Sequence, residues 1–406
     1  MSFEQGLSGL NAASKSLDVI GNNVANASTV GFKGARAEFA DVYATSLSGG
    51  GGTNIGIGTS LSAVAQQFSQ GNITVTNNPL DVAINGAGFY RLSTNGTITY
   101  SRNGQFSLDK DGFVVNASGQ HLTGYPPNAS GGVTTASPTD LQVSAADLPP
   151  TLTTKATANV NLDSRATALS SAAFNMSDST TYQGATSMSV YDSLGNAHSL
   201  SMYFVKTAAN SWDVYGANDG TQIAGGPIGQ VNFTSSGAID TTTTTMPMAL
   251  TLPVSTGASP ITMNLDLSGS TQFGSAFGVN SLTQDGYASG KLTGYNVSPD
   301  GTITGRYSNG QTRAQGQIAL ANFNNPQGLT SLGNNQWAET AASGSALTGA
   351  PNSGSLGVLQ SGATEDANID LTAELVNMIT AQRVYQANAQ TIKTQDSVMQ
   401  TLVNLR

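Results

Sequence analysis

The sequence predicts a mainly β protein with a long α-helix at each end of the chain. Three observations indicate this fold class. Apolar residues near both termini recur every 3.5 residues, as in coiled-coil helices. The middle consists of short alternating runs between turn signals, a pattern typical of antiparallel strands. Two similar blocks flank a long insertion. We therefore expect a nested multi-domain protein in which the terminal helices pair as a coiled coil and two antiparallel β domains lie outward from them.

The first predicted helix lies within residues 1–27. One face carries large apolar side chains on the 3.5-residue lattice, with an isoleucine beside them. These candidate contact residues are Phe3, Leu7, Leu10, Leu17, Ile20 and Val24.

A longer helix is predicted at residues 368–406, which contain no Gly or Pro. Its acidic first turn, with Asp370 and Glu374, suits the positive end of a helix dipole. The apolar candidates on this helix are Leu371, Leu375, Met378, Tyr385, Ile392, Met399 and Val403. At 1.5 Å per residue the helix would span roughly 50 Å. An apolar stripe of this length is unfavourable in water, so it needs a partner. Two interpretations fit: the helices clamp the ends of one globule, or they pack against other copies.

Residues 28–70 and 359–367 are predicted to form an extended connector around the helical domain. It includes a Gly-rich stretch at 46–60, but no Gly-Lys-Ser/Thr follows the glycines, so a phosphate-binding loop is not indicated. Residues 71–144 with 285–358 are predicted to form the middle β domain, and residues 145–284 an inserted outer β domain. Hairpin signals in the middle domain are Asn85-Gly86, Asn95-Gly96, Asn103-Gly104 and Asp111-Gly112.

Composition excludes several classes of function. The net charge is -9, and no basic cluster with interleaved aromatic residues occurs, which argues against a nucleic-acid partner. No apolar run approaches the roughly 18 residues that span a bilayer, and a Sec-type signal is not evident. The chain has no cysteine, so disulfides and thiolate metal sites are excluded. Acid, base and metal-ligand residues do not cluster, so we expect no catalytic residue, no cofactor and no metal site, and hence no enzyme.

Four stretches resemble the rod and hook axial proteins of the bacterial flagellum: residues 6–36, 78–90, 100–116 and 368–405. The insertion and the stretch at 190–206 resemble the hook members of that family, because the rod members are shorter. The residues that carry the first two motifs are Asn22, Asn23, Asn26, Gly31, Phe32, Asp81, Asn85, Gly86, Gly88 and Phe89.

The resemblance implies a structural subunit that polymerises with copies of itself into a helical tube. Such a tube would be the extracellular hook, a flexible universal joint that transmits torque from rod to filament. Implied neighbours are the distal rod, the hook cap and the hook–filament junction proteins. The implied delivery is through the flagellar type III export machinery, without a cleaved signal peptide. The alternatives are another axial protein, at the distal rod or the hook–filament junction, and a secreted β-rich adhesin.

Overall fold

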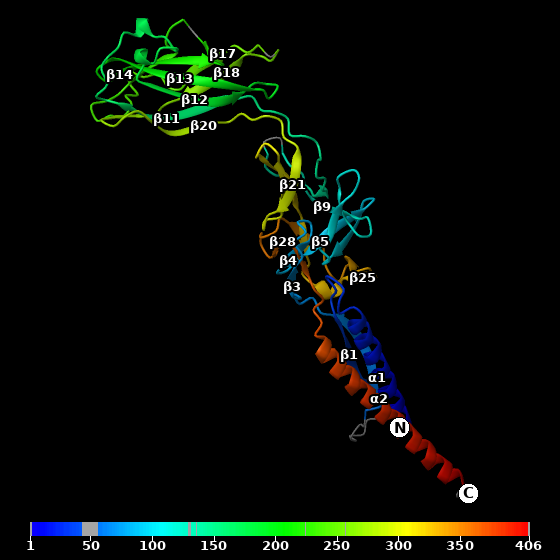
Figure 1. Cartoon of the computed structure of the whole chain (residues 1–406). Helices are drawn as coiled ribbons and strands as arrows, with labels where there is room; N and C mark the ends of the chain where they lie inside the picture. Colours follow the sequence, from blue (N-terminus) through cyan, green and yellow to red (C-terminus); the bar gives the residue numbers. More distant parts are fainter. Residues whose placement is uncertain are drawn as a thin grey trace. The chain divides into compact units, whose positions relative to one another are not determined.

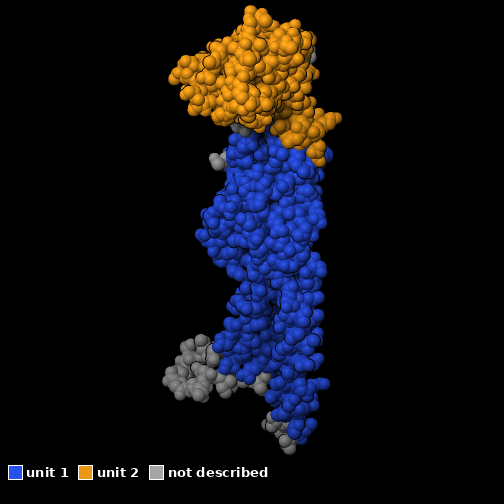
Figure 2. Space-filling view, turned by 60° about the vertical axis from the view of Figure 1, so that its left-hand side comes forward, with its two compact units in different colours: residues 1–145, 294–306, 312–406 blue, residues 146–293, 307–311 orange. Residues whose placement is uncertain are grey.

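The computed structural model describes residues 2–42, 56–128, 131–134, 136–223, 225–255 and 257–404. They divide into two compact units, coloured separately in Figure 2. Unit 1 comprises Met1–Ala145, Gly294–Arg306 and Thr312–Arg406, and unit 2 comprises Ala146–Thr293 and Tyr307–Gln311. Unit 2 is thus an insertion in unit 1. The finer division into four parts, with the boundaries given above, stays a prediction.

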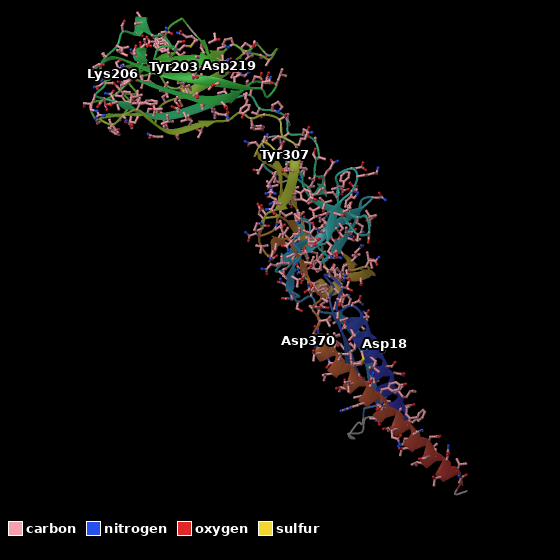
Figure 3. All side chains as sticks on the ribbon, in the orientation of Figure 1. Asp18, Tyr203, Lys206, Asp219, Tyr307 and Asp370 are labelled. Atoms are coloured by element: carbon pink, nitrogen blue, oxygen red, sulfur yellow. The ribbon has the colours of Figure 1, made fainter. Side chains whose placement is uncertain are left out.

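The helices belong to unit 1: α1 is Ser2–Ala25 and α2 is Leu371–Asn404 (Figure 1). Asp370 caps α2, because its Oδ1 accepts hydrogen bonds from the backbone N–H groups of Thr372 and Ala373 at 2.9 and 3.1 Å. Figure 3 shows Asp370 at the start of this helix. The predicted fold class, mainly β with a helix at each end, is confirmed.

Two strands lie within the predicted connector 28–70. β1 (Ala35–Val42) and β2 (Gly58–Gln66) pair antiparallel. The pair is held against α1, where Gln5 Nε2 donates to the carbonyl of Gly56 at 2.6 Å and the backbone N–H of Thr59 donates to Ser8 Oγ at 3.3 Å. Most side chains of both strands are exposed, so the sequence has no alternating apolar pattern that would predict these strands. Residues 43–55 of the connector, together with 405 and 406, lie outside the described residues.

The other strands of unit 1 pair across the insertion. β3 pairs with β29, β4 with β28, β5 with β24, β6 with β26 and β9 with β23, each joining a strand before unit 2 to one after it. The largest sheet has the order β21-β22-β23-β9-β5-β6-β26-β25. The bounds are β3 (Ile73–Val75), β4 (Val82–Asn85), β5 (Phe89–Thr94), β6 (Thr97–Ser101), β7 (Phe106–Leu108), β8 (Val114–Asn116), β9 (His121–Tyr125), β10 (Thr139–Asp140), β21 (Leu292–Val297), β22 (Thr302–Tyr307), β23 (Thr312–Ile318), β24 (Leu320–Asn322), the 3₁₀ turn η3 (Pro326–Gly328), β25 (Thr330–Gly333), β26 (Gln336–Ala338), β27 (Leu347–Gly349), β28 (Val358–Ser361) and β29 (Ala363–Glu365).

Two of the four hairpin signals join paired strands. Asn95-Gly96, both with positive φ, connects β5 to β6, and Asp111-Gly112 connects β7 to β8. The other two do not form hairpins: β4 and β5 do not pair around Asn85-Gly86, and β6 and β7 do not pair around Asn103-Gly104. There β4 pairs instead with β28, far away in the sequence, so the hairpin interpretation of these two signals is wrong.

Unit 2 consists of two sheets that share one apolar core. The sheet orders are β17-β18-β11-β19, with β20 beside β11, and β12-β13-β14-β15, with β16 beside β14. Side chains of β11, β13, β14, β17 and β18 bury the core together, around Trp212. The bounds are β11 (Lys155–Asp163), η1 (Ser171–Ala173), η2 (Ser179–Thr181), β12 (Gly184–Tyr191), β13 (Ala197–Ala208), β14 (Ser211–Asn218), β15 (Thr221–Gln222), β16 (Gly229–Asn232), β17 (Met248–Leu252), β18 (Ile261–Asp266), β19 (Thr271–Phe273) and β20 (Gly278–Gln284).

The pairing in unit 2 is not antiparallel throughout. β11 runs parallel to β18 and β19 and antiparallel to β20. β11 is the first strand of the unit, and the rest of the insertion separates it from these neighbours. Parallel pairing needs such long connections, whereas hairpin signals report only on neighbouring strands.

His198, in β13, lies between two carboxylates of unit 2. Its Nδ1 is 2.6 Å from Oδ2 of Asp219 and its Nε2 is 3.3 Å from Oδ2 of Asp192. Burial lowers the pKa of His198, but the hydrogen bonds and negative charges of the two aspartates outweigh burial, so the pKa is raised above 6.5. Figure 3 marks Asp219, whose own pKa is lowered, mainly by its hydrogen bond to His198.

We expect the stability of unit 2 to fall as the pH rises. A histidine whose pKa is raised in the folded state stabilises the fold fully below its unfolded-state pKa of 6.5, and this contribution is lost as the pH rises through the folded-state pKa. Thermal unfolding followed by tryptophan fluorescence at several pH values from about 5.5 to about 8.5, in a Trp337→Phe background so that only Trp212 of unit 2 reports, measures the effect. His198→Gln should flatten the pH dependence, whereas His121→Gln, which alters the other histidine, should keep it. Equal slopes in the two variants would contradict this assignment.

Candidate functional site

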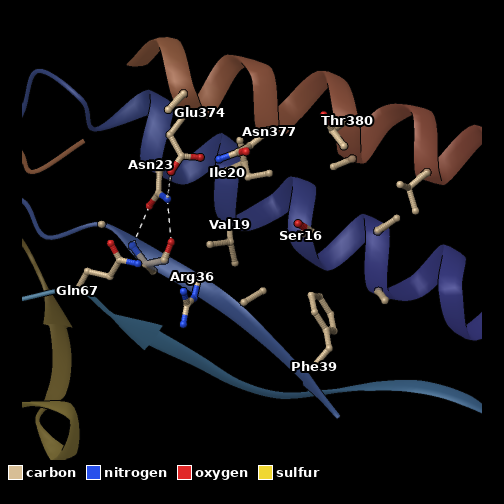
Figure 4. A pocket seen from close by; sticks show the side chains of 18 of the residues that line it. Ser16, Val19, Ile20, Asn23, Arg36, Phe39, Gln67, Glu374, Asn377 and Thr380 are labelled. Carbon is tan, nitrogen blue, oxygen red and sulfur yellow. Dashed lines mark hydrogen bonds between the residues drawn. The ribbon is translucent and has the colours of Figure 1, made fainter. Parts of the chain in front are cut away.

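α1 and α2 pack against each other in opposite directions, and Figure 4 shows part of this contact. Near one end Asn23 Nδ2 donates to Oε1 of Glu374 at 3.2 Å. Near the other end a Cβ placed on Gly6 would lie 3.1 Å from Cγ1 of Ile392. The predicted pairing of the terminal helices is therefore present within a single chain.

Small residues line the face of α1 that meets α2. A Cβ on Gly9 would lie 2.8 Å from the side chain of Asn388, and Ala13 is buried. The lack of side-chain bulk lets α2 approach the backbone of α1. This row follows heptad spacing and consists of Gly6, Gly9, Ala13, Ser16, Ile20 and Asn23. The sequence prediction considered large apolar residues, so of this row it included only Ile20.

Most of the predicted apolar stripe of α1 lies on another face. Ile20 is buried, whereas Phe3 and Leu7 are exposed and Leu10, Leu17 and Val24 are half-buried. Gly21 lies on the same face as Leu17 and Val24, and a Cβ built there would have no heavy atom within 4 Å. Apart from Ile20, the large apolar side chains of α1 thus lie outside the row that meets α2.

Some of the predicted apolar residues of α2 are half-buried, and others are exposed. Met378 and Ile392 are half-buried, whereas Leu371, Leu375, Tyr385, Met399 and Val403 are exposed. Met399 lies seven residues after Ile392, which contacts α1 at Gly6. The N-terminal end of α1 does not extend as far as Met399. The sequence stripe and the contact between the helices therefore coincide only in part.

The first family motif connects α1 to β1. Asn23 is buried, its Nδ2 donates to the carbonyl of Ala35 at 2.8 Å, and its Oδ1 accepts from the N–H of Ala35 at 3.0 Å. Gly31, with φ of 69°, lies against the backbone of Arg102 and Asn103, where a side chain would not fit. The remaining motif residues cap and cover this turn: Asn26 Nδ2 donates to Asn22, and Phe32 is half-buried.

The second family motif lies beside the first. The carbonyl of Gly86 accepts from Nη2 of Arg102 at 2.8 Å, and Gly88, with φ of 124°, leads the chain into β5. Phe89 packs edge-on against Phe68 and Trp337, with ring centroids 5.5 and 5.7 Å apart, at the centre of an aromatic cluster. Asp81 Oδ1 accepts from Asn78 Nδ2 at 3.1 Å, and Asn85 Oδ1 accepts from Gln70 Nε2 at 3.4 Å.

A buried charge cluster, Lys33, Arg102 and Glu365, joins these segments. Lys33 Nζ is 2.7 Å from Oε1 of Glu365, and Nη1 of Arg102 is 3.2 Å from Oε2. Glu365 also accepts from the N–H of Gly71 at 2.8 Å through Oε1 and from the N–H of Gly31 at 2.7 Å through its carbonyl. The cluster ties the end of the first motif, the end of the connector, β6 and β29 together.

Burial lowers the pKa of Lys33 and the pKa of Arg102, while the Glu365 carboxylate acts on both in the opposite direction. Both cations therefore depend on one carboxylate for compensation. Sequence reasoning missed all three residues. Their rarity in a chain with 10% charged residues was the only available signal, and it does not reveal which charges meet.

Other kinds of site find no support in the described part of the chain. There, no group of three or more His, Cys, Asp or Glu side chains could hold a metal ion. Neither of the described helices combines the length and apolarity needed to span a bilayer.

Four family models match parts of the chain, in the order of the sequence. They are described as flagella basal body rod protein (residues 3–33), flagellar hook protein FlgE/F/G D1 domain (83–170), flagellar basal body protein FlaE D2 domain (161–287) and flagellar basal body rod FlgEFG protein C-terminal (360–405). The matches cover both helices, strands β4 to β10 and β29 of unit 1 and most of unit 2.

Relatives match over the whole chain. The flagellar hook proteins FlgE of Salmonella typhimurium and Escherichia coli are each 44% identical, over 420 and 416 residues that cover 100% of both chains. That of Borreliella burgdorferi is 34% identical and covers 100% of this chain and 99% of its own. The crystal structure of the Helicobacter pylori flagellar hook protein FlgE2 has a TM-score of 0.53 at 15% identity, covers 72% of this chain and 99% of its own, and shows a similar fold.

We expect Glu365→Gln to destabilise unit 1 strongly. Removing the carboxylate leaves Lys33 and Arg102 buried without their counter-ion, which costs about 3–5 kcal/mol in the free energy of unfolding. Denaturant unfolding of the full chain, followed by helix content, measures this loss. The control is Glu38→Gln, which removes an exposed pair with Arg36 at 3.3 Å and should change the free energy by less than about 1 kcal/mol. Similar effects of both changes would show that burial of the cluster does not matter.

We expect Gly9→Leu to separate α1 from α2, because a side chain at Gly9 meets Asn388. Gly21→Leu is the matched control: the space there is open, and replacing Gly within a helix gains up to about 1 kcal/mol. The thermal midpoint of the far-ultraviolet circular dichroism signal of the monomeric chain should fall for the first variant only. Equal midpoints would argue against the close helix contact.

Proposed function

This chain belongs to the family of the flagellar hook protein FlgE, and from that membership we propose how the subunit works. It is a structural subunit of the hook, and proteins of this family polymerise in the flagellar axis. We propose that the terminal helices form the stiff inner core of a helical tube and that the β units form its compliant outer layer. The tube then acts as a universal joint that transmits torque from rod to filament.

The observation that carries this proposal is the exposure of large apolar side chains on both helices. Phe3 and Leu7 of α1 and Leu371, Leu375 and Ile379 of α2 are exposed in the single chain. Burying a fully exposed side chain of this kind is worth about 1.5–3 kcal/mol, and these half-exposed side chains would gain part of that energy. Contacts between the helices of neighbouring copies would gain this energy and make the core resistant to twisting.

The solvent-exposed face of unit 2 supports the proposal that the β units form a compliant layer. Along β12, β17 and β18 the exposed positions alternate with core positions and carry small neutral side chains, among them Ser187, Ser189, Thr251 and Thr262. Surfaces of this kind form few strong contacts. Neighbouring copies could therefore slide past one another as the tube bends.

We further propose the partners and the location that family membership suggests. The polymer would adjoin the distal rod, the hook cap and the hook–filament junction proteins. The subunit would be delivered by the flagellar type III export machinery and remain in the extracellular hook without cleavage of a signal peptide. We propose a structural role without catalysis, because the family is one of structural hook proteins.

The alternative functions explain fewer of the observations on this chain. The distal rod and the hook–filament junction belong to the same axial structure, but full-length identity of 44% to hook proteins favours the hook. A secreted adhesin would explain the β units but not two terminal helices that expose apolar faces.

We expect Leu375→Glu to prevent polymerisation without unfolding the subunit. Leu375 is exposed, so a charge costs the single chain little, whereas a charge buried between copies costs several kcal/mol. Electron microscopy of cells producing the variant should show basal bodies without hooks, and the purified protein should keep the wild-type unfolding midpoint. Gln386→Glu, which adds the same charge to a polar position of α2, should still give hooks. Normal hooks from Leu375→Glu would argue against the helix-core proposal.

A further inference from the structure

Residues 358–368 run through unit 1 as one segment, which we call the strap. It consists of β28, β29 and residues 366–368, and it leads toward α2. Leu359, Ala363 and Glu365 of the strap are 2%, 0% and 1% exposed. The strap is therefore part of the interior of unit 1, although it follows all other β strands of that unit in the sequence.

The strap supplies the strand partners of β3 and β4. β28 pairs antiparallel with β4 and β29 pairs antiparallel with β3, each as a separate two-stranded sheet, so no other strand of the described chain pairs with either (Figure 1). Val82 and Ile84 of β4 are each 1% exposed, and Leu359 of the strap lies opposite Ile84. Without the strap, β3 and β4 would lose the hydrogen bonds of their ladders, and water would reach the buried side chains of β4.

Hydrogen bonds outside these two sheets tie the strap to the connector. Asn368 Nδ2 donates to the carbonyl of Gln67 at 2.6 Å, and Asn368 Oδ1 accepts from the N–H of Gly34 at 2.8 Å. The N–H of Asp366 donates to the carbonyl of Asn72 at 2.8 Å. The strap also carries the carboxylate of the buried charge cluster. It thus joins the connector, both two-stranded sheets and the charge cluster.

The charge cluster connects the strap to the largest sheet of unit 1. Arg102, 3.2 Å from the Glu365 carboxylate, places its Cζ 5.5 Å from the centroid of the Phe89 ring. Phe89 in turn packs edge-on against Trp337 of β26. Loss of the strap would leave Arg102 buried without its counter-ion beside the aromatic cluster, which is strongly unfavourable. The effect of the strap therefore extends beyond β3 and β4.

Unit 2 is built without the strap. Both of its sheets consist of strands of unit 2 alone, and the buried residues of its core around Trp212 lie between positions 156 and 267. All of them precede the strap in the sequence. Unit 2 therefore has its complete core before the strap is present.

We propose that docking of the strap closes unit 1, so that the β strands of unit 1 fold only when the strap is in place. The chain is synthesised from its N-terminus, so unit 2 is complete first and unit 1 closes last. This inference concerns the single chain and goes beyond the proposed function. In a polymer of this chain it would exclude copies that lack the strap, because their helices would have no folded base.

Hydrogen exchange of the full-length monomeric chain, followed by mass spectrometry of its peptides, tests the proposal because it reports on each strand separately. Ala363→Asp places a charge at a fully buried position of the strap and prevents docking. We expect loss of protection in β3 and β4 and also in β5, β6 and β26 of the largest sheet, with unchanged protection in β13 and β14 of unit 2. The control Gln360→Asp adds the same charge at an exposed position of the strap and should leave the protection of all these strands unchanged.

Two outcomes would overturn the proposal. Loss of protection confined to β3, β4 and the strap would show that the strap only covers part of unit 1. Loss in unit 2 as well would show that the strap does not act on unit 1 alone. Neither result depends on whether the chain forms hooks, so the proposed function is tested separately.

A second variant tests the proposal in the opposite direction, should Ala363→Asp give no soluble protein. Oγ1 of Thr74 in β3 and Oγ1 of Thr364 in β29 are 3.5 Å apart, and the natural chain has no cysteine. In Thr74→Cys/Thr364→Cys a disulfide can therefore hold the strap in place. The oxidised chain should exchange more slowly than the reduced chain in the largest sheet of unit 1 and equally fast in unit 2. Equal exchange of both forms in the largest sheet would contradict the proposal.

Discussion

The structure of unit 1 depends on one buried carboxylate. Glu365, 1% exposed, compensates Lys33 and Arg102 and accepts a backbone hydrogen bond from Gly71. These partners come from both ends of the chain and from the β strands between, so the cluster forms only after the chain has closed on itself. A buried ion pair adds little net stability, but one missing partner costs several kcal/mol. The cluster therefore fixes which segments meet at the base of the helices, and with them the place where α1 and α2 leave the β strands.

The helices that leave this junction reverse the usual arrangement of a helix pair. Small residues such as Gly6 and Gly9 lie between α1 and α2, and large apolar residues such as Leu7 and Leu375 lie outside. A closed globule would place the large residues in the contact, because burying them gains more energy. The single subunit is thus left with apolar surface on its helices, which gains burial only from further copies. Family membership and the exposed apolar faces of both helices support the same conclusion, that the subunit is completed by polymerisation.

Unit 2, in contrast to the helices, buries its large apolar side chains within itself. Its two sheets enclose an apolar core around Trp212, and the exposed positions of its strands carry mainly small neutral side chains. It needs no neighbour to bury its core. A subunit that is incomplete at its helices and complete in its inserted unit suits a tube that must resist twisting yet bend, because strong contacts are confined to one part of the chain.

The sequence by itself determined the elements whose signals are local. Apolar periodicity located both helices, turn chemistry located the hairpins at Asn95-Gly96 and Asp111-Gly112, and ordered motifs indicated the family. Only the tertiary structure decided which faces and charges meet. It turned the large stripe of α1 away from α2, used Asn85-Gly86 for a turn outside any hairpin, and brought Lys33 to Glu365. The physical reason is distance along the chain: helix periodicity and turn conformation depend on neighbouring residues, whereas the contact of α1 with α2 and the buried charge cluster join residues more than 300 positions apart.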